Sequence, residues 1–134
     1  MTLKTPTKYA DIGLLILRVG IGIMFLYHGA PKLFGGPVKW EKLGMAMSYA
    51  GIHFMPVIWG LMAAISEFFG GICLILGLFF RAVCILLAIT MGIAVSMHLQ
   101  KGEGLMVASH AIEDGIVFLG LILIGPGRYS IDKK

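Results

Sequence analysis

Three histidines, His28, His98 and His110, stand out as side chains that could do chemistry in this chain of 134 residues. Each lies near the end of a long apolar stretch, and counting at about 1.5 Å per helical residue places all three at a similar depth. Glu113 and Asp114 follow His110 by three and four residues, a spacing that puts them on neighbouring parts of one helix face. A lysine lies one turn beyond the first histidine. These positions predict a polar chamber lined by His28, Lys32, His98, His110, Glu113 and Asp114.

The residue types in this chamber suit three interpretations. Three imidazoles and a carboxylate are suitable ligands for zinc, copper or non-haem iron, and two opposed histidines could ligate haem, although the ligands come from separate segments without a local motif. Imidazole and carboxyl groups could also bind a quinone head group by hydrogen bonds and exchange protons with water during its reduction. In the third interpretation, histidines near a membrane surface simply meet water and lipid head groups.

Two charged residues, Arg18 and Glu67, lie deep inside apolar stretches. Counted from Asp11, Arg18 is about 10 to 12 Å into the hydrocarbon, and counted from Pro56, Glu67 is about 16 Å in from the opposite side. An isolated charge at that depth costs several kcal/mol, so we expect Arg18 and Glu67 to pair. The pair would either staple two helices together or form the charged floor of a binding cavity.

The elements that position these residues are predicted by the hydropathy of the chain. Hydrophobic residues make up 58% of the sequence and charged residues 13%, with a mean hydropathy of +0.92, which is far more apolar than a soluble domain. We therefore expect an all-α, polytopic membrane protein, with residues 1–134 forming one domain. A mixed segment at 39–52 is too polar to span, and should lie along the membrane surface or cap the bundle. The expected transmembrane helices cover approximately 12–30, 57–80, 82–99 and 105–124.

The basic residues favour a membrane role and exclude nucleic acid as a partner. The net charge is +4, but Lys and Arg are scattered singly at the ends of the apolar stretches, where they serve topology. Four spans place both termini on one side, and the balance of charges favours the cytoplasm for that side. The basic residues expected there are Lys4, Lys8, Arg81, Arg128, Lys133 and Lys134, against Lys32, Lys39, Lys42 and Lys101 on the other side.

Short glycine-containing motifs accompany the polar residues along the chain. They include Arg18-Val19-Gly20, His28-Gly29, Lys32 to Gly35, Glu67 with Gly70-Gly71, Gly77 to Arg81, His98, and Gly125 to Asp132. As a set, these motifs resemble the DoxX family over almost the whole chain. The resemblance implies a bacterial or archaeal inner-membrane protein with four helices. Members of that family are linked to thiosulfate:quinone oxidoreductase, as its membrane subunit, and to membrane complexes that handle oxidative and thiol stress with partner enzymes.

Carried over by position, the family's intramembrane polar residues correspond to five residues of this chain, and an acidic position opening the last helix corresponds to Glu113. His110 and Asp114 have no counterpart in the pattern, which weakens the metal interpretation. The five matching residues are Arg18, His28, Lys32, Glu67 and His98.

The sequence and the resemblance therefore predict the membrane subunit of a redox system, either quinone-linked or concerned with thiol or oxidative stress, which binds a small ligand in a chamber on the outer side. Because little soluble mass is present, we expect an oxidoreductase subunit that works with a protein partner or a second copy of itself. One alternative is a non-enzymatic assembly or stress-response factor. The other is a small-molecule carrier with Glu67 at its site, against which the four helices and the lack of an inverted repeat argue.

Overall fold

The computed structural model describes residues 7–132 and is all-α over that range, as the sequence predicts. Four helices are long and apolar enough to cross a membrane. These are α1 (Thr7–Leu33), α3 (Pro56–Leu76), α4 (Phe80–Gln100) and α5 (Leu105–Ile124). Helix α2 (Pro37–Gly44) and a 3-10 helix, η1 (Met45–Ala50), lie between the first two spans. Among the residues used for topology, Lys4, Lys133 and Lys134 lie outside the described range.

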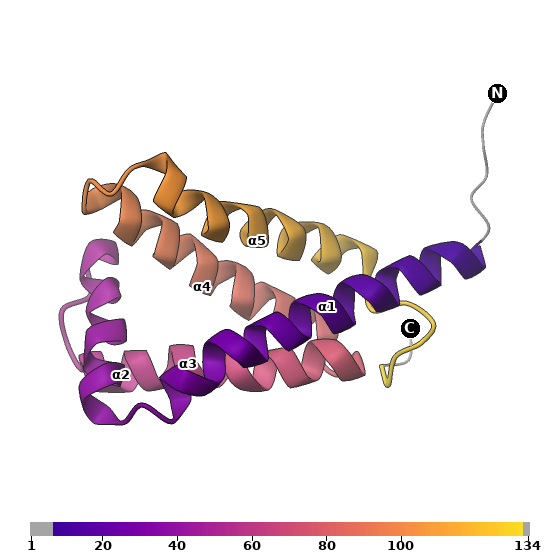
Figure 1. Ribbon diagram of the computed structural model, residues 1–134, viewed down its shortest axis with the longest axis horizontal. Helices are drawn as coiled ribbons and strands as arrows, with labels where there is room; N and C mark the ends of the chain where they lie inside the picture. The colour runs from indigo at the N-terminus through magenta and orange to yellow at the C-terminus, as the bar shows by residue number, and fades with distance from the viewer. Residues whose placement is uncertain (1–6, 133–134) are drawn as a thin grey trace.

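The four long helices form two antiparallel pairs. Helix α1 packs against α3, and α4 packs against α5, while a smaller contact between α3 and α4 joins the pairs (Figure 1). Glycines allow the first pair to approach closely, because a Cβ on Gly22 would collide with the Gly71 carbonyl. Within the described residues the backbones of α1 and α5 stay apart, and Phe25 bridges them by an edge-on contact with Phe118 at 5.2 Å between ring centroids.

The segment between α1 and α3 caps one end of the bundle. Proline at the first position starts α2, and the helix then crosses the end of the bundle (Figure 1). It packs so tightly on α3 that a Cβ on Gly60 would overlap the Trp40 carbonyl and one on Gly44 would overlap that of Pro56. We call this the lysine end, defined by α2, η1 and the 101–104 turn, because Lys39, Lys42 and Lys101 lie there.

The opposite end, which we call the arginine end, contains Arg18, the 77–79 turn and the segment 125–132. Helix α3 was expected to continue to residue 80, but it ends at Leu76. Gly77 there adopts a left-handed conformation with φ 67°, which closes the helix, and α4 already begins at Phe80 instead of residue 82. The carboxylate of Asp132 accepts the backbone N–H groups of Phe79 and Phe80 at 2.9 and 2.8 Å, so the segment 125–132 caps α4.

Candidate functional site

Arg18 and Glu67 are both buried, with 1% and 5% of their surface exposed, but the predicted pairing between them is wrong. The Arg18 guanidinium instead donates four hydrogen bonds of 2.8 to 3.1 Å to backbone carbonyls. Two acceptors belong to the last turn of α3 and two to the segment 125–132. They are the carbonyls of Leu74, Ile75, Pro126 and Tyr129.

The expectation failed because the two depth counts did not share a common membrane edge. Helix α1 has 27 residues against 21 for α3, and its first turns project past the arginine end (Figure 1). Arg18 therefore lies level with Leu74, seven residues or about 10 Å further along α3 than Glu67. The last carbonyls of α3 have no N–H partner within the helix and form the negative end of its dipole, so they favour the positive charge of Arg18. Arg18 is thus a structural staple.

Glu67 pairs with Lys32 of α1 instead. The Lys32 ammonium donates to both carboxylate oxygens, at 2.8 and 3.1 Å. The Lys32 side chain is 31% exposed and the Glu67 side chain 7%, so the lysine covers the buried carboxylate from its more open side. Close packing of α1 on α3 sets this geometry, because a Cβ on Gly29 would press against the backbone of Phe68 and Glu67.

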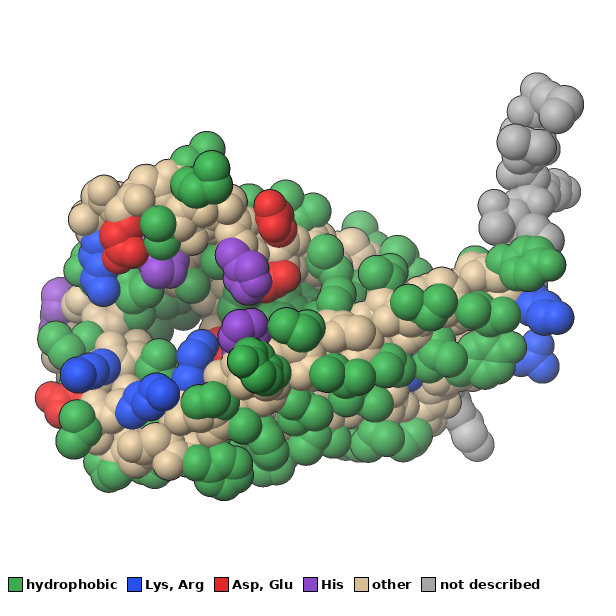
Figure 2. Space-filling model, viewed as in Figure 1, with side chains coloured by type: hydrophobic (Ala, Val, Ile, Leu, Met, Phe, Trp, Pro, Cys, Tyr) green, Lys and Arg blue, Asp and Glu red, His purple; other side chains and the backbone are tan. Residues whose placement is uncertain are grey.

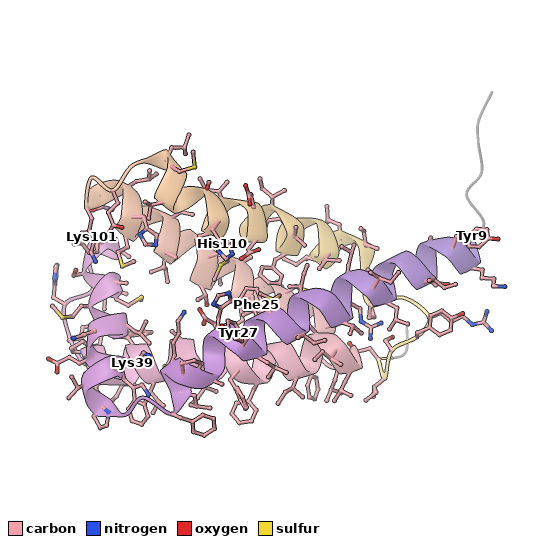
Figure 3. The ribbon with its side chains drawn as sticks, viewed as in Figure 1. Tyr9, Phe25, Tyr27, Lys39, Lys101 and His110 are labelled. Carbon is pink, nitrogen blue, oxygen red and sulfur yellow. The ribbon has the colours of Figure 1, made fainter. Side chains whose placement is uncertain are left out.

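The Lys32–Glu67 pair forms one wall of a central chamber of about 230 Å³. Five of the six predicted site residues line this cavity, and Glu67 joins them. Figure 2 shows the molecule hollowed here, with histidine, basic and acidic side chains around the opening. In Figure 3, Phe25 and His110 point toward the space between α1 and α5. The polar lining consists of His28, Lys32, Glu67, His98, His110 and Asp114.

The histidines of the chamber have different neighbours. The rings of His28 and His110 lie 6.0 Å apart between centroids, edge to face, across the gap between α1 and α5. His110 Nδ1 is 3.5 Å from the carboxylate of Asp114, one turn further along α5. His98 Nδ1 lies 3.2 Å from the carboxylate of Glu103 in the 101–104 turn. The arrangement supplies several neutral or charged hydrogen-bonding groups that can exchange protons.

Glu113 is the predicted site residue that the structure does not bring into the chamber. It is exposed on α5 and lines none of the cavities described here, whereas its neighbour Asp114 is half-buried and lines the chamber. The helical step of about 100° per residue explains the difference, since Glu113 lies about 60° to one side of His110 and Asp114 about 40° to the other.

The structure gives no support to the metal interpretation of His28, His98 and His110. Over residues 7–132, no three side chains of His, Cys, Asp or Glu are gathered closely enough to hold a metal ion. His98 faces Glu103, while His28 and His110 meet each other at the α1–α5 gap.

Two further cavities adjoin the chamber. An apolar groove of about 270 Å³ runs between α1 and α5 and shares Phe25, His28, His110 and Asp114 with it. We call this the lateral groove, and its remaining lining is Ile16, Leu17, Gly20, Ile21 and Met24. The second, of about 410 Å³, lies under α2 and η1 and shares Lys32, Glu67, Ala94 and His98 with the chamber. We call it the roofed cavity.

Sequence reasoning missed the lateral groove and the partnership of Lys32 with Glu67. The pair had one signal, the glycines that let α1 and α3 pack closely: Gly22 contacts Gly71, and Gly29, one turn before Lys32, contacts the backbone of Glu67 and Phe68. The lateral groove has no comparable signal in the sequence, because its apolar residues do not differ from those of an ordinary lipid-facing helix surface.

Comparisons with known proteins agree with this architecture. A family model described as DoxX matches residues 13–112. An uncharacterized protein of Haemophilus influenzae is 28% identical, over 95% of this chain and 93% of its own length. Two inner membrane proteins of Escherichia coli are also similar: YphA is 28% identical over 95% of this chain and 97% of its own, and YqjF is 30% identical over 94% of each. No solved structure matches the chain.

Proposed function

This chain belongs to the DoxX family of membrane proteins, and we propose that it is the membrane subunit of a redox system that binds a quinone head group in its central chamber. Four apolar helices and inner-membrane relatives make it a multi-pass membrane protein in contact with the lipid bilayer. The finer assignment, to a quinone, rests on the geometry of the chamber.

The observation that carries the proposal is the continuity of the polar chamber with the lateral groove. A quinone has a polar ring that accepts hydrogen bonds and an apolar chain that dissolves in lipid. The shared residues His28, His110 and Asp114 would meet the ring, while the lateral groove along α1 would take the start of the chain. Because the backbones of α1 and α5 stay apart, the ligand could enter sideways from the bilayer.

The chamber residues suit the proton side of quinone chemistry. Reduction of a quinone to a quinol takes two electrons and two protons. His110, whose Nδ1 lies 3.5 Å from the Asp114 carboxylate, can donate a proton to one ring oxygen. The Lys32–Glu67 pair also lines the chamber and can serve as a second proton-exchanging group. The electrons would come from a partner protein that carries the reductant, so the chain acts as a subunit.

The proposed orientation puts the lysine end, and with it the chamber, on the outer side of the inner membrane. Besides the buried Arg18, the described basic residues near the arginine end are Lys8, Arg81 and Arg128, and they would then lie in the cytoplasm with both termini.

The test is purification with native lipids, followed by extraction and mass spectrometry for quinone bound per protein. We expect wild type to retain quinone above the level of the surrounding lipid, and Asp114→Asn to retain less. Glu113→Gln is the matched control, since it changes an adjacent carboxylate that lies outside the chamber. Equal quinone retention by Asp114→Asn and Glu113→Gln, or no quinone on the wild-type protein, would count against the quinone site.

A second function is favoured by the way the buried charges satisfy themselves. Arg18 uses four backbone carbonyls and Glu67 uses Lys32, so both residues have a structural role without any ligand. Under this alternative the protein is a non-enzymatic assembly or stress-response factor. This alternative is favoured if the protein purifies without a ligand and cells that carry the Asp114→Asn variant keep a normal redox state.

A further inference from the structure

The roofed cavity has a chemistry different from that of the central chamber. Three lysines line it near the lysine end: Lys39 and Lys42 from α2, and Lys101 from the turn after α4. Lys32 and Glu67 also line it, but they neutralise each other as an ion pair. The cavity therefore has an excess of positive charge.

These three lysines have no carboxylate within ion-pair distance among residues 7–132. Lysines on an open surface need no partner because water solvates them. Lys39, Lys42 and Lys101 are themselves exposed, but they also line one cavity from two elements. Their like charges repel one another there, and an anion that enters the cavity relieves that repulsion. Figure 3 shows Lys39 and Lys101 at the same end of the molecule, on different elements.

Apart from Thr90 and His98, the remainder of the lining is apolar and would hold more than a bare ion. Leu43 and Met47 come from the roof, and Ile93 and Met97 from α4. Trp59 also lines the cavity, and its indole N–H is buried without a hydrogen-bond acceptor in the described part of the chain.

The roof over this cavity is fixed from two sides. Gly44 and Gly60 let α2 contact the start of α3 backbone to backbone. The Gln100 amide at the end of α4 donates to the Tyr49 carbonyl of η1 at 2.9 Å. The helix that carries Lys39 and Lys42 is thus held over the cavity by packing.

We propose that the roofed cavity binds a small organic anion, in which a carboxylate, phosphate or sulfonate group is carried on an apolar body. Lys39, Lys42 and Lys101 would hold the charged group, and the apolar walls would hold the body. This site adjoins the proposed quinone position, but Lys39, Lys42 and Lys101 line neither the chamber nor the lateral groove.

Binding of radiolabelled benzoate to the protein in phosphatidylcholine nanodiscs tests the proposal. We expect saturable binding that weakens by about tenfold or more in the triple variant Lys39→Gln, Lys42→Gln, Lys101→Gln, because three favourable charges are lost. The control is Lys8→Gln with Arg128→Gln, which removes exposed charges elsewhere and should leave binding unchanged. Uncharged benzamide should bind far more weakly than benzoate.

The anion could reach the site as a soluble molecule or as the head group of an anionic lipid. In nanodiscs that contain phosphatidylglycerol, competition with benzoate, together with enrichment of that lipid on wild type but not on the triple variant, would assign the site to a lipid head group. Undiminished benzoate binding there would assign it to a soluble anion.

Absence of saturable benzoate binding and of lipid enrichment, or equal binding by wild type and the triple variant, would overturn the proposal. Retained quinone should be the same in both proteins, which separates this result from the quinone test.

Discussion

Lys32 donates to both carboxylate oxygens of Glu67, and the two residues together line both the central chamber and the roofed cavity. The pair therefore stands at the boundary between two ligand-sized spaces. A change in either residue should alter the stability of the α1–α3 pair and also the charge of both cavities.

Replacement of Lys32 by Met should destabilise the protein. The Glu67 carboxylate would remain buried without its cation, and an unsatisfied buried group costs about 1 to 3 kcal/mol. The free energy of unfolding in detergent micelles measures this loss. The double variant with Glu67→Gln should recover part of it, because both charges are then absent, and Lys39→Met should have little effect. A double variant whose loss equals the sum of the single losses would mean that the two side chains do not interact.

Replacement of Arg18 by Lys should be almost as damaging as its removal. A single ammonium cannot reach four carbonyls on two segments, so we expect a loss of about 2 kcal/mol or more. Tryptic cleavage after residue 128 should also speed up, because the segment 125–132 loses two of its anchors. Arg128→Lys, at an exposed position, is the control. Unchanged thermal unfolding and cleavage in Arg18→Lys would show that charge alone is sufficient.

The packing of α2 on α3 can be tested at Gly60. Ala at this position would place its Cβ on the Trp40 carbonyl, and overpacking of this kind costs about 1 to 3 kcal/mol. Gly92→Ala is the matched control on α4, because the added Cβ meets nothing within 4 Å. We expect a lower melting temperature and altered tryptophan emission for Gly60→Ala only. Identical behaviour of the two variants would argue against a tightly seated roof.

The lateral groove can be filled without disturbing the core. A Cβ on Gly20 or on Gly120 meets nothing within 4 Å, but only Gly20 lines the lateral groove. Gly20→Leu should therefore reduce the quinone retained on purification severalfold while leaving the melting temperature close to that of wild type. Gly120→Leu should retain quinone normally. Equal retention in the two variants would exclude the lateral groove as the position of the quinone chain.

The sequence predicts the four spans and most of the chamber because both depend on regular helical geometry. Long apolar stretches have one stable solution in a bilayer, and residues four apart, such as His110 and Asp114, share a face wherever the helix packs. The chamber residues of α1, His28 and Lys32, follow the same rule. For these four residues the tertiary structure adds distances, but the predicted lining of the chamber stays the same.

The charge partners could not be predicted in this way because they depend on the relative heights of helices. The overhang of α1 shifts Arg18 by about two turns relative to Glu67, and residue counting has no common origin to detect this. The acceptors of Arg18 are backbone carbonyls, which carry no residue-type signal. The end of α3 depended on a left-handed Gly77 that looked like one more small residue in an apolar run.

The Arg18 staple also orders events in time. Pro126 and Tyr129 are synthesised 108 and 111 residues after Arg18, so half of its acceptors do not exist when α1 first enters the bilayer. The other two acceptors arrive with α3. Closure of the arginine end must therefore be a late event in biogenesis, and a chain halted before residue 126 would leave this guanidinium short of partners inside the membrane. A segment made more than 100 residues after Arg18 is thus the one that locks the first helix.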